Sequence, residues 1–125
     1  MYTVSDKKGK VVKMDCIFCM IIDGKIPSSK VYEDERILAF KDVNPQAPVH
    51  VLVVPKKHIA SADDITSENS GIVAGIFEKI PEIAKSAGCG NGYRVITNCG
   101  EDACQSVKHL HFHILGGRKL AEEMA

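Results

Sequence analysis

The sequence has no excess of charge of one sign, no long hydrophobic run and no internal repeat. Its 125 residues include 16 basic and 16 acidic side chains, so the formal net charge is zero. A balanced charge argues against a protein that chiefly neutralises the phosphates of a nucleic acid. The longest apolar run, around residues 51–55, is far below the roughly 20 residues that span a bilayer. We therefore expect neither nucleic acid nor membrane as a partner.

The N-terminus also lacks the apolar segment that a signal peptide requires, because residues 1–14 are polar, lysine-rich and without periodicity. We expect these residues to form a flexible lead-in. The remaining residues, 15–125, are enough for one ordinary domain and too few for two. The sequence therefore predicts a single soluble domain with a cytoplasmic location.

The five cysteines do not favour a disulfide framework, because their number is odd and no signal peptide points to an oxidising compartment. Cys16 and Cys19 form a C-x-x-C pair, which suits either redox chemistry or half of a tetrahedral metal site. The pair alone does not decide between them, since a metal site needs two more ligands. We interpret Cys89, Cys99 and Cys104 as ordinary buried or partly buried thiols.

Hydrophobic patterning predicts an α+β fold with an antiparallel sheet. Strand-like runs bounded by turn residues occur at residues 30–33, 36–40, 50–54, 93–97 and 109–115. The first two are separated by Asp34 and Glu35, which suggests a hairpin. A short buried helix is expected over residues 16–22. Apolar residues at three- and four-residue spacing over 72–87 predict a long helix, bent at Pro81. Ser61 and Thr66 are candidate N-caps for a short turn and for that long helix.

Three of the five histidines alternate with apolar residues in the last strand-like run. Successive side chains of a strand point to opposite faces. His109, His111 and His113 are therefore expected on one face, and Leu110 and Phe112 on the core face. Imidazole is both a nucleophile and a metal ligand, and it changes charge near neutral pH. Three imidazoles on one face indicate a chemical site that surrounds a small anion or shares a metal.

The loop over residues 98–106 brings further polar groups towards this face. Asn98, Gln105, Ser106 and the backbone N–H groups of the loop are suited to hold a phosphate. An ordinary turn, in which Asn and Ser bond their own backbone, is the alternative. The neighbouring histidines favour the anion site.

Residues 105–118, with the sequence QSVKHLHFHILGGR, resemble the signature of the histidine triad (HIT) superfamily. The flanks, Gln105-Ser106 and Gly116-Gly117-Arg118, are similar to those of its Hint branch, the nucleoside phosphoramidate hydrolases. Similar segments elsewhere extend the resemblance over residues 15–118, at 17–18, 38–40, 42, 44–48, 55–59 and 98. The resemblance implies a five-stranded antiparallel sheet with one long and one or two short helices. It also implies a homodimer across which the sheet continues, with a purine nucleotide site on each protomer.

The resemblance implies roles for individual residues. His111 corresponds to the nucleophile that attacks the α-phosphorus and forms a nucleotidyl-histidine intermediate, while His113 and Ser106 contact the phosphate or the leaving group. The rest of the implied nucleotide site is Asn98, Gln105 and the backbone of Cys104 at the phosphate, Asp42 and Val43 at the ribose, and Ile17, Phe18, Ile21 and Phe40 at the base. Core packing is the alternative interpretation for these last four residues. Cys104 stands where the branch commonly has glycine.

Zinc-binding relatives complete the cysteine pair with histidines at the positions of His50 and His109. The resemblance therefore implies a Cys₂His₂ zinc site formed by Cys16, Cys19, His50 and His109. Such a site would be structural, since four protein ligands leave no position for a catalytic water, and catalysis would require no metal. Two buried, reduced thiols beside hydrogen-bonded histidines are the alternative.

The implied activity is hydrolysis of purine nucleoside phosphoramidates, or of related adenylated substrates, to an AMP-like nucleoside monophosphate. Two alternatives stay open. One is a dinucleoside polyphosphate hydrolase, as in the Fhit branch of the same superfamily. The other is a zinc-stabilised nucleotide-binding module whose role is interaction rather than turnover.

Overall fold

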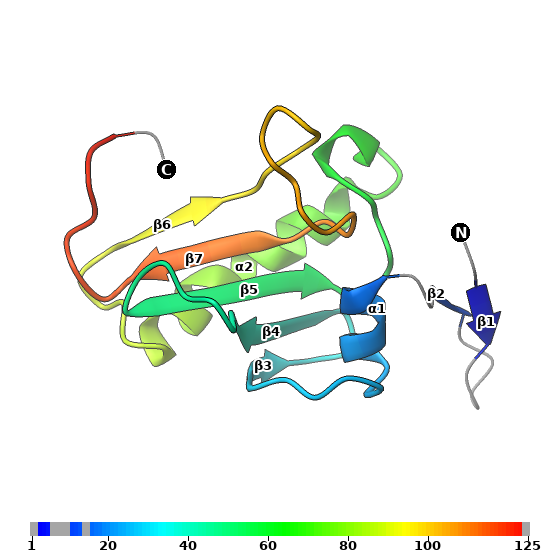
Figure 1. The fold of residues 1–125 in the computed structure, drawn as a ribbon, viewed down its shortest axis with the longest axis horizontal. Helices are drawn as coiled ribbons and strands as arrows, with labels where there is room; N and C mark the ends of the chain where they lie inside the picture. Colours follow the sequence, from blue (N-terminus) through cyan, green and yellow to red (C-terminus); the bar gives the residue numbers. More distant parts are fainter. Residues whose placement is uncertain (1–2, 6–10, 14–15, 124–125) are drawn as a thin grey trace.

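The computed structural model describes residues 3–5, 11–13 and 16–123 of the chain. Its main sheet has five antiparallel strands in the order β3-β4-β5-β7-β6 (Figure 1). The strands are β3 (Lys30–Glu33), β4 (Ile37–Lys41), β5 (Val49–Pro55), β6 (Tyr93–Ile96) and β7 (Phe112–Gly116). The long helix α2 (Ser70–Ser86) covers one face, and the short helix α1 (Ile17–Ile22) lies against the other face at one end. The predicted α+β class and antiparallel sheet are confirmed.

Strand alternation divides the apolar residues between two cores. On β5, Val51 and Val53 belong to the core under α2, whereas Leu52 and Val54 belong to the core under α1. The central strands are therefore buried on both faces, which explains why residues 51–55 of β5 form an unbroken apolar run. The larger core lies under α2. The smaller core supports the histidine face.

The turn between β3 and β4 is built by one carboxylate. Asp34 accepts hydrogen bonds from the backbone N–H groups of Arg36 at 2.7 Å and Ile37 at 2.9 Å. It also accepts one from the Tyr32 hydroxyl at 2.8 Å. A side chain that bonds the backbone two residues further on favours a tight turn, which is the hairpin expected from the sequence.

The helix starts match the sequence predictions only in part. Ser61 caps the short 3₁₀ helix η1 (Ala62–Asp64), as expected. Thr66 does not cap α2, so that prediction is wrong: Asn69 holds the N-cap position. The Thr66 N–H donates to Asn69 Oδ1 at 2.7 Å, so Thr66 forms a turn ahead of the helix. The helix then continues through Pro81 to Ser86.

Two short strands, β1 (Thr3–Ser5) and β2 (Val11–Lys13), pair antiparallel near α1 (Figure 1). They fall within residues 1–14, where the sequence suggested no regular structure. The flexibility of that lead-in stays a prediction. Within the described part of the chain, no helix is both long and apolar enough to cross a membrane.

Candidate active site and metal centre

The histidine segment joins the sheet later than predicted: residues 107–109 form a bend, and β7 begins only at Phe112. Ahead of the strand, the Leu110 N–H donates to the Ile59 carbonyl at 2.6 Å. The Thr97 hydroxyl donates to the His111 carbonyl at 2.8 Å. These two bonds hold the backbone of Leu110 and His111 where no neighbouring strand pairs with it. The side chains of the segment still point alternately to the two faces. Leu110 and Phe112 pack in the core under α2, while the histidine rings contact the residues of α1 and of one another.

The His111 ring is held in one orientation by its own neighbour. Its Nδ1–H donates to the His109 backbone carbonyl at 2.6 Å. Since a carbonyl oxygen can only accept, the proton of the neutral ring sits on Nδ1 and Nε2 carries a lone pair. Burial lowers the pKa of His111, which keeps the ring neutral near pH 7. The site therefore presents an unprotonated nitrogen, the form that a nucleophile requires.

A chain of hydrogen bonds places the proton of the neutral His113 ring on Nε2, whereas the His111 ring carries its proton on Nδ1. The Gln46 N–H donates to Nδ1 of His50 at 3.0 Å, so the His50 proton lies on Nε2. This Nε2 is 2.9 Å from Nδ1 of His113, which must accept and carry its own proton on Nε2. Burial, with smaller effects of His111 and His50, lowers the pKa of His113 to about 4. His113 is thus a neutral hydrogen-bond donor beside the His111 ring.

Asp42, the predicted ribose contact, lies next to this chain. Its Oδ2 is 3.4 Å from Nε2 of His50, and its Oδ1 accepts from the Asn44 N–H at 2.8 Å. Burial lowers the pKa of His50, and the Asp42 carboxylate opposes that effect. Asp42 is partly exposed, so one side of the carboxylate is open to a hydroxyl group of a ligand.

The loop over residues 98–106 is braced by the side chain that the sequence assigned to phosphate binding. Gln105 accepts from the Gly100 N–H at 3.0 Å and donates to the carbonyls of Ala60 at 2.8 Å and Val107 at 3.0 Å. The Cys104 N–H likewise donates within the loop, to the Glu101 carbonyl at 3.0 Å. These two residues shape the loop, and their donors are already engaged.

Two other polar side chains of that region are available. Among the described residues, neither the Asn98 amide nor the Ser106 hydroxyl has a hydrogen-bond partner. Asn98 is partly buried and Ser106 is exposed. Donors of this kind are suited to bind the oxygens of a phosphate.

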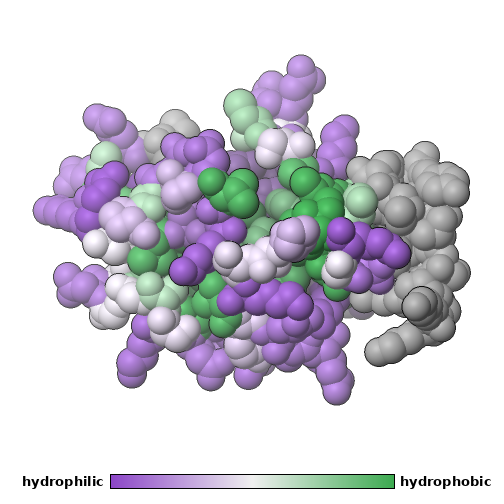
Figure 2. All heavy atoms as spheres, turned by 60° about the horizontal axis from the view of Figure 1, so that its bottom comes forward, coloured by the Kyte–Doolittle hydropathy of each residue, from purple (hydrophilic) through white to green (hydrophobic). Residues whose placement is uncertain are grey.

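Phe18 and Phe40, two of the expected base-binding residues, form an aromatic wall beside His111. The ring of Phe18 meets those of Phe40 and His111 edge-on, with centroids 5.5 and 5.0 Å apart. Phe18 and Phe40 are buried, Ile17 is 47% exposed and Val43 is fully exposed. Figure 2 shows apolar side chains reaching the surface near the end of the molecule that holds α1. Phe18, Ile21 and Phe40 all belong to the core under α1, as the packing alternative for these residues suggested.

A second cluster of side chains lies at the other end of this face. Cys16, Cys19, His58 and His109 each offer one ligand atom, and all four atoms lie within 4.8 Å of one another. Nδ1 of His109 is 3.4 Å from the Cys16 sulfur and 3.6 Å from the Cys19 sulfur. Nδ1 of His58 is 3.2 Å from the Cys19 sulfur. Two sulfurs and two imidazole nitrogens converging on one point match a tetrahedral zinc site.

The chemistry of these donors fits zinc. Nε2–H of His109 donates to the Pro55 carbonyl at 2.8 Å, so Nδ1 faces the thiols with a lone pair. Interactions with the side chains of Cys19 and His109 outweigh burial and lower the pKa of Cys16 to about 3. A thiolate is the form of cysteine that binds metal. A Cys16 thiolate and an unprotonated His109 Nδ1 are therefore already in the form that binds zinc.

The assignment of His50 to the metal site is wrong, because His58 holds that place. His50 is the second residue of β5, whereas His58 follows the end of this strand by three residues. His50 therefore lies five extended residues, about 16 Å, before Pro55. His109 bonds the carbonyl of Pro55, at the far end of the strand. Because β7 runs antiparallel to β5, the residues before β7 lie near the end of β5. The sequence signal that we missed is the histidine that follows Pro55 by three residues.

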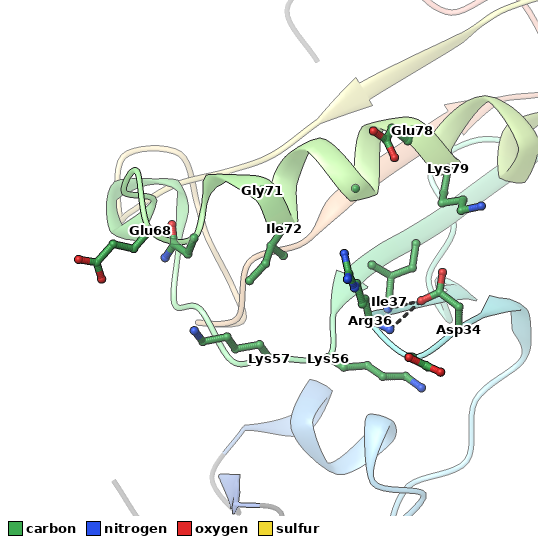
Figure 3. A pocket seen from close by; sticks show the side chains of 13 residues that line it. Asp34, Arg36, Ile37, Lys56, Lys57, Glu68, Gly71, Ile72, Glu78 and Lys79 are labelled. Atoms are coloured by element: carbon green, nitrogen blue, oxygen red, sulfur yellow. Dashed lines mark hydrogen bonds between the residues drawn. The ribbon is translucent and has the colours of Figure 1, made fainter.

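A cavity of about 520 Å³ lies on the opposite side of the sheet, between α2 and the β3–β4 turn (Figure 3). Arg36 and Lys57 line it from the sheet side, and Glu68, in the turn before α2, and Glu78 on α2 line it from the other side. None of its described lining residues is a histidine, a cysteine or a serine. The cavity thus lacks the nucleophiles that the histidine face provides.

Fold and site together describe a small α+β protein with an unprotonated imidazole nitrogen on His111 beside a thiol–imidazole cluster. The family described as "Scavenger mRNA decapping enzyme C-term binding" matches residues 15–124. A solved histidine triad protein from Clostridium difficile is 57% identical, with 90% of this chain and 98% of that chain covered and a TM-score of 0.86. A HIT family hydrolase from Clostridium thermocellum is 45% identical, with 91% and 100% covered and a TM-score of 0.88. The chain belongs to the histidine triad superfamily.

A plant relative bears on the metal centre. The chain is 42% identical over 124 residues to a "14 kDa zinc-binding protein" from Zea mays, with 93% of this chain and 94% of that protein covered. This similarity and the converging ligands agree in suggesting zinc binding.

Proposed function

We propose that the protein hydrolyses purine nucleoside phosphoramidates, or related adenylated substrates, as the Hint branch of the superfamily does. The observation that carries the proposal is the hydrogen bond from His111 Nδ1–H to the His109 carbonyl, which leaves Nε2 free to attack. The partly exposed Asp42 and the Phe18–Phe40 wall are suited to a ribose and a base. Solved relatives described as HIT family hydrolases support hydrolysis in general.

In the proposed reaction, His111 Nε2 attacks the α-phosphorus and forms an N–P bond while the bond from phosphorus to the amine breaks. The departing amine takes a proton from Ser106 or His113. The positive charge that develops on the His111 ring is stabilised by the His109 carbonyl at Nδ1. Water then attacks the phosphorus and gives its proton back to the group that protonated the amine, while the N–P bond breaks and the nucleoside monophosphate and the free histidine are released.

Replacement of the nucleophile tests this mechanism. We expect His111→Ala to lower kcat/KM for adenosine 5′-phosphoramidate by at least about 10³-fold, because no other group can form the intermediate. Binding of AMP, measured by calorimetry, should survive the substitution. Lys108→Ala, an exposed neighbour outside the site, serves as the control and should keep full activity. Turnover by His111→Ala at the normal rate would show that another residue is the nucleophile.

The alternatives are separated by substrate. Faster cleavage of a diadenosine polyphosphate than of the phosphoramidate would favour a dinucleoside polyphosphate hydrolase. Binding of AMP without cleavage of either compound would favour a nucleotide-binding interaction module. The proposed hydrolase requires the phosphoramidate to be the better substrate.

We propose that the metal centre holds one structural zinc ion on Cys16, Cys19, His58 and His109. Elemental analysis of protein purified without chelator or nickel resin should find about one zinc per chain. The variant His58→Ala should lower that content, whereas His50→Ala should not, since His50 contacts His113 instead. A folded protein without zinc would contradict the metal site and leave the nucleophile unaffected.

A homodimer and a cytoplasmic location belong to the same proposal. The outer edge of β6 has no partner strand among the described residues, and Phe77 on α2 is 48% exposed. All five cysteines are free thiols, which suits a reducing compartment.

A further inference from the structure

Phe18 lies between the metal centre and the nucleophile. In the sequence it stands between the two cysteine ligands, and it is 6% exposed. In space its ring meets the rings of His109 and His111 edge-on, with centroids 6.0 and 5.0 Å apart. A single buried side chain therefore contacts both a metal ligand and the nucleophile.

His109 makes a second connection. Its Nδ1 faces the sulfurs of Cys16 and Cys19, while its backbone carbonyl accepts the Nδ1 proton of His111. A ligand residue thus also sets the orientation of the catalytic ring. A shift of the His109 backbone would therefore move the carbonyl that holds the His111 ring through a hydrogen bond of 2.6 Å.

The helix that carries Phe18 depends on external anchors. α1 has six residues, too few to be stable by itself, and a cysteine at its N-cap accepts from the Cys19 N–H at 3.4 Å. Both thiols of this helix point at the metal centre. An ion bound there would fix α1 on the sheet. The position of Phe18, in the aromatic wall, and of its half-exposed neighbour Ile17 would be fixed with it.

We propose that the metal centre and the nucleotide site are energetically coupled through Phe18 and His109. Metal raises the affinity for nucleotide, and by linkage a bound nucleotide raises the affinity for metal by the same factor. Phe18 acts as a positioning residue in this coupling. The inference rests on the proposed nucleotide site and extends it by a dependence on metal. Since couplings between sites are typically about 5–150-fold, we expect a change of about tenfold.

Calorimetry with AMP tests one direction of the coupling. The dissociation constant is measured for the zinc-loaded protein and for protein treated with a chelator, whose folding is checked by circular dichroism. We expect AMP to bind about tenfold more weakly without zinc. The other direction needs only the zinc-loaded protein: competition with a chromophoric chelator gives the zinc affinity with and without saturating AMP.

Two variants separate the role of Phe18 from general packing. Phe18→Leu keeps an apolar side chain but removes the edge-on ring contacts, so the coupling should fall below about threefold while zinc still binds. Tyr32→Leu also replaces an aromatic ring by leucine, on β3, where Tyr32 packs against the core under α2, and it removes the hydrogen bond to Asp34 in addition. This control should leave the coupling intact.

The outcomes are distinct. Equal AMP affinity with and without zinc, or equal zinc affinity with and without AMP, would overturn the coupling and leave the proposed function standing. Failure of AMP to bind either form would overturn the proposed nucleotide site itself. An unchanged coupling in Phe18→Leu would remove Phe18 from the connection.

Discussion

At the residue scale, the buried imidazoles determine how the protein responds to acid. The pKa of His113 is about 4 in the folded chain, against an ordinary value of about 6.5. Between these pH values the unfolded chain binds a proton on this residue and the folded chain does not. Lowering the pH through this window therefore favours unfolding, whereas above about pH 7 the residue has no effect.

We accordingly expect the free energy of unfolding to fall by about 2 kcal/mol between pH 6.5 and pH 4 on account of His113. Urea unfolding at pH 7.5, 6.5, 5 and 4 measures the fall. Carboxylates and other histidines titrate as well, so the comparison is with His113→Gln, which should show a smaller loss over the same range. Parallel pH profiles for both proteins would mean that His113 is not held neutral by the fold.

At the scale of the elements, two glycines should respond to the same substitution in opposite ways. A Cβ at Gly116 in β7 would lie 2.6 Å from the sulfur of the buried Cys89, so Gly116→Ala should lower the free energy of unfolding by about 1–3 kcal/mol. A Cβ at Gly75 in α2 would meet nothing within 4 Å. Since alanine is the better helix former, Gly75→Ala should raise the free energy of unfolding by about 0.5–1 kcal/mol.

Chemical denaturation of both variants checks this pair, with each serving as the control for the other. If both substitutions destabilised the protein, the open surface beside Gly75 would be covered by something outside the described residues. Equal and small effects would show that Cys89 can move away from β7 at little cost.

At the scale of the whole molecule, the proposed dimer can be tested by changing one exposed side chain. Phe77 on α2 and Tyr93 on the edge strand β6 are 48% and 40% exposed. Permanent homodimers have large apolar interfaces, so a charge there should separate the protomers. We expect light scattering to report a dimer at micromolar concentration and Phe77→Glu to report a monomer.

Val43→Glu is the matched control, because it places the same charge on another exposed apolar residue at the loop beside Asp42. It should leave the molar mass unchanged. A monomeric unmodified protein at micromolar concentration would rule out the dimer in this form.

Patterns within short stretches of the sequence determined much of the fold and the superfamily of this protein. Alternation with period two placed Leu110 and Phe112 in one core and the histidines on the other face, because that period is a property of any extended backbone. The short helix after Cys16 and the hairpin around Asp34 followed from turn chemistry within a few residues. The motif around His111 identified the superfamily.

Contacts between distant segments decided the rest, and only the tertiary structure contains them. Whether His50 or His58 joins the cysteines depends on which end of β5 meets the start of the histidine segment. Cys16 and His109 are 93 residues apart and meet only because α1 folds back on the sheet. The ring protons of His50, His111 and His113 follow from their acceptors and donors, and these partners are set by register rather than by composition.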